Sequence, residues 1–231
     1  MYAKFLKRAF DFLLSLLALS VLSPILLLLC VIGAIAMGGN PFFVQPRPGK
    51  KDINGKEKIF KLIKFRTMSN KTDENSKLLP DEVRLNGYGR FLRTTSLDEL
   101  PELMNILIGD MSIVGPRPQL VRDMTFMTPQ QRRRHDVRPG LTGLAQVSGR
   151  NNITWEQKFQ YDLQYIDSGI TLWNDVKIIL QTVGKVLKRS DTVREGTASD
   201  LDFGDWLMQE GKINQAQYDE KQAQAKELLK V

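Results

Sequence analysis

The fold of this chain is decided near its start by residues 12–37, FLLSLLALSVLSPILLLLCVIGAIAM, a stretch that contains no charged residue. A helix of this length, rising about 1.5 Å per residue, more than crosses a hydrocarbon core of roughly 30 Å. Ser23-Pro24 interrupts the stretch, and Pro24 lacks the amide proton that a helix interior needs. The stretch therefore predicts a membrane segment, which is either a kinked single span or a re-entrant hairpin that enters and leaves by one face.

Basic residues stand on both sides of this segment. Three lie between positions 4 and 8, and five more lie between positions 47 and 58. An excess of Lys and Arg marks the cytoplasmic side, so a single span would carry one basic flank across the membrane, whereas a hairpin keeps both inside. The Ser23 hydroxyl is a candidate partner for the backbone groups that a break at Pro24 would free. The flanks therefore favour a re-entrant hairpin that bends at Ser23 and Pro24.

A cleaved signal peptide is the alternative for the N-terminal segment, because Ala34-Ile35-Ala36 follows a basic start and an apolar stretch. The apolar stretch is longer than the usual roughly 7–15 residues of such peptides, which argues against cleavage. Cys30 is the one cysteine of the chain, so no disulfide forms within it. This cysteine usage indicates a reducing compartment.

The remainder of the 231 residues is long enough for one domain with its own core. Asn54-Gly55 before an apolar stretch predicts a β-hairpin whose second strand covers 59–65. Apolar residues at helical spacing predict helices over 96–111, 155–166 and 175–189. The last of these carries basic residues opposite its apolar face, so it is a candidate for contact with a bilayer surface.

We expect an α+β fold in three parts. These are a membrane hairpin over 1–40, a mostly helical domain with a small β-hairpin and surface amphipathic helices over 41–195, and a C-terminal helical tail over 196–231. In the tail, the sequence predicts two short helices, over 205–210 and 215–229. It shows no residues there with an evident catalytic role. We assign it to interaction or self-association.

A paired carboxylate motif, Ser96-Leu97-Asp98-Glu99-Leu100-Pro101, is the sharpest local feature of this domain. Ser96 and Glu99 have the spacing of a capping box, which predicts that Asp98 and Glu99 lie in the first turn of a helix. A carboxylate at the positive end of a helix is stabilised as the anion, and so is available as a nucleophile or metal ligand. Simple helix capping is the alternative, because acidic first turns are common.

Several basic residues stand near predicted turns or share a strand face. Lys64 and Arg66 lie on one face of the predicted strand, and Arg93 precedes the carboxylate pair. Arg117 lies between two prolines, and a rigidly held guanidinium suits bidentate phosphate recognition. Arg150 closes the turn Ser148-Gly149-Arg150, which suits close backbone approach to a ligand. Solvent exposure and ordinary turn chemistry are the simpler interpretations of each.

Composition and residue types exclude several other kinds of site. The net charge of +7 suits anionic membranes, phosphorylated substrates or nucleic acid, but no nucleic-acid-binding module is recognisable. His135 is the one histidine, and the run Arg132–His135 is interpreted as a solvated or membrane-facing cluster. A Cys-His pair, a His/Cys zinc site and a Walker or dinucleotide motif are therefore not expected. A carboxylate pair with many cations suits phosphoryl chemistry with a divalent ion at a bilayer surface.

Residues 7 to about 194 resemble the bacterial sugar transferases that start glycan assembly on a lipid carrier, the monotopic phosphoglycosyl transferases, in their minimal PglC-like form. The matching pieces, in this order, are Lys7-Arg8-Ala9-Phe10-Asp11, Ser23-Pro24, Lys64-Phe65-Arg66-Thr67-Met68, Leu92-Arg93-Thr94-Thr95-Ser96-Leu97-Asp98-Glu99-Leu100-Pro101, Val114-Gly115-Pro116-Arg117-Pro118 and Arg138-Pro139-Gly140-Leu141-Thr142-Gly143.

The resemblance implies a re-entrant helix inserted in the cytoplasmic leaflet of the bacterial inner membrane, with a cytoplasmic catalytic domain. It implies that Asp98 attacks the sugar-bearing phosphate of a UDP-sugar, expels UMP and holds a phosphosugar ester. Undecaprenyl phosphate then attacks this ester, which begins the assembly of a glycoconjugate such as a polysaccharide or lipopolysaccharide. Glu99 matches the acidic partner that binds Mg²⁺, and Lys64, Arg93 and Arg117 match basic positions that bind phosphates or support the pair.

Two other hypotheses remain open. A non-catalytic, membrane-anchored adaptor could use its basic domain to bind anionic lipid or nucleic acid, with affinity that falls steeply with salt. An enzyme with the same chemistry could instead be anchored by a single span. No residue identifies the UDP-sugar, and the tail leaves a homo-oligomer open.

Overall fold

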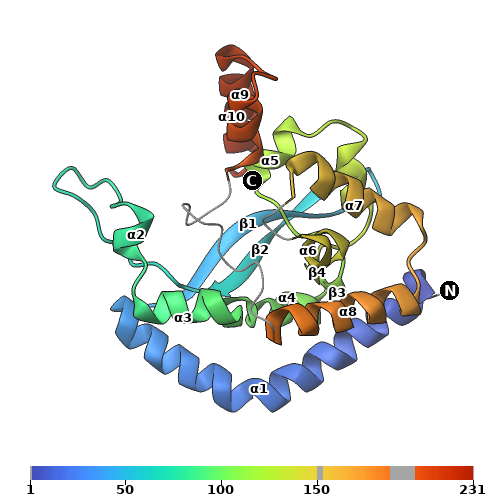
Figure 1. Ribbon diagram of the computed structural model, residues 1–231, viewed down its shortest axis with the longest axis horizontal. Coiled ribbons are helices and arrows are strands. Elements are labelled where there is room, and N and C mark those ends of the chain that lie inside the picture. Colours follow the sequence, from blue (N-terminus) through green and yellow to red (C-terminus); the bar gives the residue numbers. More distant parts are fainter. Residues whose placement is uncertain (1, 150–152, 188–200, 231) are drawn as a thin grey trace.

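The computed structural model describes residues 2–149, 153–187 and 201–230. The long helix α1 bends, and the rest of the molecule lies on the inner side of this bend (Figure 1). The helices are α1 (Lys7–Met37), α2 (Asp81–Arg84), α3 (Gly87–Thr95), α4 (Glu102–Ile108), α5 (Val121–Phe126), α6 (Leu144–Ser148), α7 (Trp155–Asp167), α8 (Leu172–Leu187), α9 (Phe203–Gln209) and α10 (Gln215–Leu228), with 3-10 helices over Leu97–Glu99 and Gln131–Asp136 and a π-helical turn over Tyr2–Leu6. The strands are β1 (Phe42–Lys51), β2 (Glu57–Phe65), β3 (Ser112–Val114) and β4 (Gly140–Thr142). This confirms a chain of mixed helices and strands that begins with a long apolar helix.

The bend of α1 lies in a helix that contains Pro24 and continues past it. Pro24 cannot donate a hydrogen bond to the Ser20 carbonyl one turn earlier. The Ser23 hydroxyl donates to that carbonyl instead, at 2.8 Å, so the predicted role of this side chain is confirmed. The predicted helix break is therefore a bend in a continuous helix, because a neighbouring side chain satisfies the carbonyl that proline leaves open.

The predicted β-hairpin is present and forms one side of the core. β1 and β2 pair antiparallel, with Phe42 opposite Phe65, and Gly55 takes a positive φ of 76° in the turn. β2 begins at Glu57, so it is longer than predicted, and it ends at Phe65. Helix α4 packs against β2 and against α1, and the buried residues of this cluster are Phe60, Leu62, Leu103, Ile106 and Met111.

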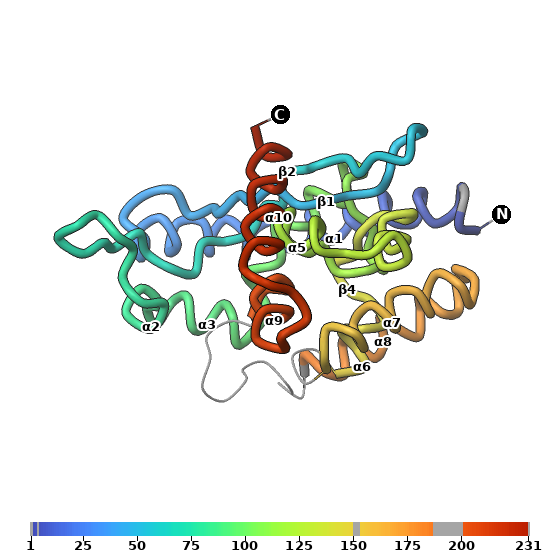
Figure 2. The backbone as a smooth tube through the Cα atoms, turned by 90° about the horizontal axis from the view of Figure 1, so that it is seen from above, coloured from blue at the N-terminus to red at the C-terminus, as the bar shows by residue number. Residues whose placement is uncertain are grey.

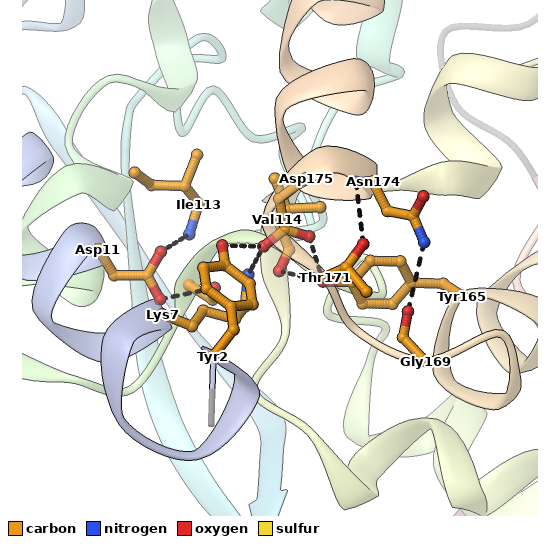
Figure 3. A network of polar contacts seen from close by, with 11 residues as sticks. Tyr2, Lys7, Asp11, Ile113, Val114, Tyr165, Gly169, Thr171, Asn174 and Asp175 are labelled. Atoms are coloured by element: carbon orange, nitrogen blue, oxygen red, sulfur yellow. Dashed lines mark hydrogen bonds and ion pairs between the residues drawn. The ribbon is translucent and has the colours of Figure 1, made fainter.

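Polar contacts also fix the start of α1 to the domain (Figure 3). The Arg8 guanidinium donates to the carbonyls of Ile106 and Leu107, at 2.6 and 2.7 Å. These carbonyls belong to the last turn of α4, where a helix leaves them without internal partners and where positive charge is favoured. The buried Asp11 carboxylate accepts hydrogen bonds from the Ser112 hydroxyl at 2.7 Å and the Ile113 amide at 3.0 Å.

Helix α8 is joined to α1 by a single carboxylate. Asp175 accepts hydrogen bonds from the Tyr2 and Tyr165 hydroxyls, both at 2.7 Å, and forms an ion pair with Lys7 at 2.5 Å (Figure 3). The opposite side of α8 exposes large apolar residues, of which Trp173 is 81% exposed. The predicted helix is therefore amphipathic, although it starts three residues earlier than expected, at Leu172.

The basic run near His135 is not the solvated or membrane-facing cluster that the sequence predicts. Arg134 and His135 are buried in the 3-10 helix that contains them. Arg132 pairs with the buried Glu57 carboxylate, whose Oε1 also lies 3.3 Å from the His135 Nδ1. Burial lowers the pKa of His135 to about 4, so the imidazole is neutral at pH 7.

The two predicted tail helices are present, and they pack against the domain of the same chain. Figures 1 and 2 place α9 and α10 against α5. The Phe203 ring lies 5.1 Å from Trp155 and 5.0 Å from Phe159 of α7, measured between centroids. The Asp123 carboxylate of α5 accepts a hydrogen bond from the Phe203 amide at 2.9 Å. Self-association through this tail stays a prediction.

Candidate active site

The carboxylate pair lies in a short 3-10 helix between α3 and α4, and not within a single helix over 96–111. Ser96 follows the last residue of α3 with a φ of 57°, and its side chain makes no capping hydrogen bond to the 3-10 helix that follows. Leu97 and Leu100 pack on the buried cluster of Leu29, Phe65 and Leu92. Because this packing and the left-handed Ser96 redirect the chain, the predicted capping box does not form.

The Glu99 carboxylate is the centre of the charged site. Its Oε1 lies 2.6 Å from Nη2 of Arg117 and 3.1 Å from Nζ of Lys64. The same Lys64 ammonium contacts Oε1 of Glu102 at 3.0 Å. Glu99, Lys64 and Arg117 come from three separate segments, so the fold brings together residues that the sequence predicts only one by one.

The pKa values of the two glutamates of this centre, Glu99 and Glu102, are shifted in opposite directions. Burial alone would raise the pKa of Glu99, but the charges and hydrogen bonds of Arg117 and Lys64 hold it far below its usual range. Burial raises the pKa of Glu102 to about 7, with the Glu99 charge adding to the rise and Lys64 opposing it. Glu99 is therefore the ionised partner of both cations.

Asp98 meets surroundings that differ from those of Glu99. Burial raises the pKa of Asp98 to about 6, and the adjacent Glu99 charge contributes to the rise. The charges of Lys64, Arg117 and Arg93 lower it only in part. The pKa of Asp98 is thus raised, opposite to the shift expected from a helix dipole alone. Even so, about ten carboxylates are ionised for each protonated one at pH 7.

The segment that carries Arg117 is fixed by backbone contacts with the motif that begins at Arg138. The Gly115 amide donates to the Thr142 carbonyl at 2.9 Å, and the Gly140 amide donates to the Pro116 carbonyl at 3.0 Å. A Cβ at Gly140 would overlap the Gly115 backbone, so this close pairing requires glycine. The motif that begins at Arg138 therefore supports the segment of Arg117 in this structure.

The remaining predicted site residues take different positions. Arg93 donates to the Thr67 hydroxyl at 3.1 Å and contacts the Met68 sulfur at 3.4 Å, close enough for its charge to act on Asp98. Arg66 follows the end of β2, and among the described residues its side chain forms no ion pair with Asp98 or Glu99. Arg150 lies outside the described residues.

Two residues of the site were missed by the sequence analysis. Glu102 is 2% exposed and shares Lys64 with Glu99, and its position three residues after Glu99 was the available signal. Arg47 donates to the Pro118 carbonyl at 3.2 Å and to the Gln45 side chain at 2.6 Å. Burial, together with the Arg117 charge, lowers the pKa of Arg47 to about 10, so it remains a cation at pH 7.

The donor set suits a magnesium ion that also binds a substrate. Asp98 and Glu99 supply hard carboxylate oxygens, and Mg²⁺ is usually held by one or two carboxylates together with phosphates and waters. Within the part of the chain that the structure describes, no group of three or more His, Cys, Asp or Glu residues could hold a metal by itself.

Comparison with known proteins gives a consistent match. The model of the bacterial sugar transferase family matches residues 2–189. The uncharacterized sugar transferase EpsL of Bacillus subtilis is 47% identical over 182 residues, which cover 79% of this chain and 87% of that protein.

Longer relatives match over only part of their own length. The undecaprenyl-phosphate galactose phosphotransferase of Salmonella typhimurium is 34% identical over 204 residues, 81% of this chain and 41% of that protein. The UDP-glucose:undecaprenyl-phosphate glucose-1-phosphate transferase of Klebsiella pneumoniae is 39% identical over 189 residues, 78% of this chain and 39% of that protein. The chain thus spans about two fifths of these two relatives. With a family match that covers α1, the carboxylate pair and the Arg117 segment, the chain belongs to the bacterial sugar transferase family.

Proposed function

We propose that this protein transfers a phosphosugar from a UDP-sugar to undecaprenyl phosphate through a covalent intermediate on Asp98, with release of UMP. The observation that carries the proposal is the half-buried Asp98 beside a Glu99 carboxylate that holds Arg117 and Lys64. The names of the Salmonella and Klebsiella relatives, which specify undecaprenyl phosphate, support this class of acceptor.

The proposed reaction has two displacements. The Asp98 carboxylate forms a bond to the sugar-bearing phosphorus, and the diphosphate P–O bond breaks to release UMP. A phosphate oxygen of the lipid carrier then attacks the same phosphorus, and the bond to Asp98 breaks and restores the carboxylate. With a pKa near 6, Asp98 is largely ionised at pH 7 and more basic than an ordinary aspartate, which favours attack.

Cations must balance the negative charge of the diphosphate as Asp98 approaches it. Arg117 has a side chain that is 41% exposed, so it can reach a ligand while it contacts Glu99. Lys64 and Arg93 add positive charge around Asp98. Glu99, beside Asp98, would hold Mg²⁺, which when bound would neutralise phosphate charge and stabilise the leaving UMP.

A re-entrant membrane helix in the cytoplasmic leaflet of the inner membrane is part of this proposal. By length and composition α1 could cross a membrane, and only 11% of its most apolar window is buried in the protein. The helix contains Pro24 and bends, which favours the re-entrant form in this proposal (Figure 1). The exposed apolar side of α8 offers a second membrane contact. A Cys30→Ala, Ala3→Cys variant tests this topology: labelling by an impermeant thiol reagent from outside intact cells would contradict the hairpin.

The covalent step is tested with Asp98→Asn and UDP-sugars radiolabelled in the sugar. We expect wild-type protein to release UMP and to retain label after denaturation, and Asp98→Asn to lose both. Asp81→Asn, which changes an aspartate in α2, is the matched control and should keep both. Full turnover by Asp98→Asn would refute Asp98 as the nucleophile. A panel of UDP-hexoses and N-acetylated UDP-sugars, assayed for UMP release with undecaprenyl phosphate, would identify the donor.

A further inference from the structure

Arg134 is buried beneath the segment that carries Arg117. Its Nε and Nη2 donate to Oδ2 of Asp162 in α7, at 2.9 and 2.7 Å. The same Nη2 donates to the backbone carbonyl of Arg117 at 2.7 Å. Arg134 is 2% exposed and Asp162 is 3% exposed, so this charged pair is fully enclosed.

A buried ion pair contributes little net stability to a protein, because both charges must be removed from water. Removing two charges from water costs several kcal/mol, and apolar residues of similar size often stabilise a protein as well or better. The pair here does something that apolar residues cannot, because a guanidinium can donate to a carboxylate and a carbonyl at once. The Phe159 ring, one turn before Asp162, lies 5.8 Å from the Arg134 guanidinium carbon and encloses it further.

The carbonyl that Arg134 holds belongs to the residue whose side chain contacts Glu99. Arg47 holds the next carbonyl, that of Pro118, at 3.2 Å. Prolines at 116 and 118 restrict the backbone on either side. Tyr165, one turn after Asp162 in α7, lies with its hydroxyl 3.4 Å from the Val114 carbonyl. One face of α7 therefore reaches the segment twice, directly through Tyr165 at Val114 and through Arg134 at Arg117.

We propose that Arg134 and Asp162 are a positioning pair, which sets the place of the Arg117 guanidinium for the diphosphate of the sugar nucleotide. This inference rests on the proposed function of Arg117. Displacement of a phosphate-binding group by about 1 Å is enough to weaken catalysis strongly, so the pair acts on the reaction without touching the substrate.

Arg134→Lys in the full-length protein tests the pair, because lysine keeps the charge but lacks the planar fork that spans two acceptors. The neighbouring pair of Arg133 and Asp167 joins the same two elements and is exposed, at 43% and 51%, so Arg133→Lys is the matched control. With the UDP-sugar that gives the fastest UMP release, we expect Arg134→Lys to raise KM by roughly tenfold or more. Arg133→Lys should leave KM within about twofold.

A double-mutant cycle separates positioning from general stability. If Arg134 acts through Arg117, Arg134→Lys should change KM by less than about twofold once Arg117 is alanine. Additive effects, or a lower melting temperature with an unchanged KM, would overturn the inference. Asp162→Asn, which keeps the Arg134 donors, provides the same test if Arg134→Lys does not fold. An unchanged KM in Arg117→Ala alone would instead refute the proposed role of Arg117.

Discussion

Asp98 and Glu99 are neighbours in the chain, yet their carboxylates meet different surroundings. Glu99 holds Arg117 and Lys64 directly, so its pKa falls, while Asp98 has burial and an adjacent negative charge that raise its pKa to about 6. Surroundings that make the pKa values of two titratable groups differ are typical of sites in which the groups have separate roles. Glu99 thus holds the two cations in place, and Asp98 is the more basic of the two carboxylates.

The raised pKa of Asp98 predicts the acid side of the pH profile. The proposed nucleophile is the ionised form, and a carboxylate with a pKa of about 6 loses that form as pH falls from 7 to 5. We therefore expect the rate of UMP release at saturating UDP-sugar to rise about tenfold from pH 5 to pH 7. Initial rates over this range, with melting temperatures to exclude unfolding, test it. A rate that is flat over this range would contradict the assignment.

The two glutamates that share Lys64 should respond differently to the loss of charge. Glu99→Gln removes the anion that holds two cations, so we expect kcat/KM to fall by about 10²-fold or more. Glu102, with a pKa near 7, is already about half neutral at pH 7, so Glu102→Gln should cost less than about fivefold. Both variants are isosteric, and each serves as the control for the other. Equal losses would show that Lys64, not Glu99, organises the site.

Sequence reasoning found the residues whose types and spacing are unusual. Arg117 between two prolines and Lys64 in the predicted strand both form ion pairs with Glu99, while their binding of phosphates stays a prediction. Arg134 was missed because three arginines in a row resemble a solvated surface. Its burial depends on Asp162, which lies 28 positions away on another helix, and no local pattern encodes that contact.

At the scale of elements, Asp175 is the joint between α1 and α8. Lys7 and Asp175 are both largely buried, and two tyrosine hydroxyls donate to the same carboxylate (Figure 3). Asp175→Asn would leave the Lys7 ammonium buried without its counter-charge. We expect a loss of about 3–5 kcal/mol in the free energy of unfolding, which is measured by thermal denaturation in detergent.

The pair of Lys51 and Asp136, which is more exposed, is the control for this joint. Asp136→Asn should change the stability by less than about 1 kcal/mol, because solvent screens the pair. A similar effect of the two substitutions would mean that the joint contributes no more than a surface ion pair. In that case the packing of α1 on α4 would be its main attachment to the domain.

Elements with strong local signals were predictable, and elements set by tertiary packing were not. Asn54-Gly55 predicts the hairpin because that dipeptide suits the turn, and the helix over 155–166 follows from its apolar period. The single helix predicted over 96–111 fails at Ser96. The left-handed conformation of that residue costs energy that only the surrounding structure compensates, through the packing of Leu97 and Leu100.

At the scale of the whole molecule, charged contacts between distant segments and apolar contacts at the periphery have separate tasks. The ion pairs of Lys64, Glu99 and Arg117 join β2 to the 3-10 helix of Glu99 and to the segment of Arg117. The outer apolar surfaces of α1 and α8 take no part in that centre and leave most of their side chains exposed. This separation suits the proposed reaction between a water-soluble nucleotide sugar and a membrane lipid.

The C-terminal tail should stabilise the domain by covering its aromatic residues. Phe203 is 3% exposed and its ring packs against Trp155 and edge-on against Phe159, the latter of which encloses Arg134. Phe203→Ala should therefore lower the free energy of unfolding by about 3–5 kcal/mol, seen as a lower melting temperature. Leu229→Ala, at the half-exposed end of the tail, is the control and should change it by less than about 0.5 kcal/mol. If Phe203→Ala dissociated an oligomer but melted at the wild-type temperature, the tail would serve self-association instead.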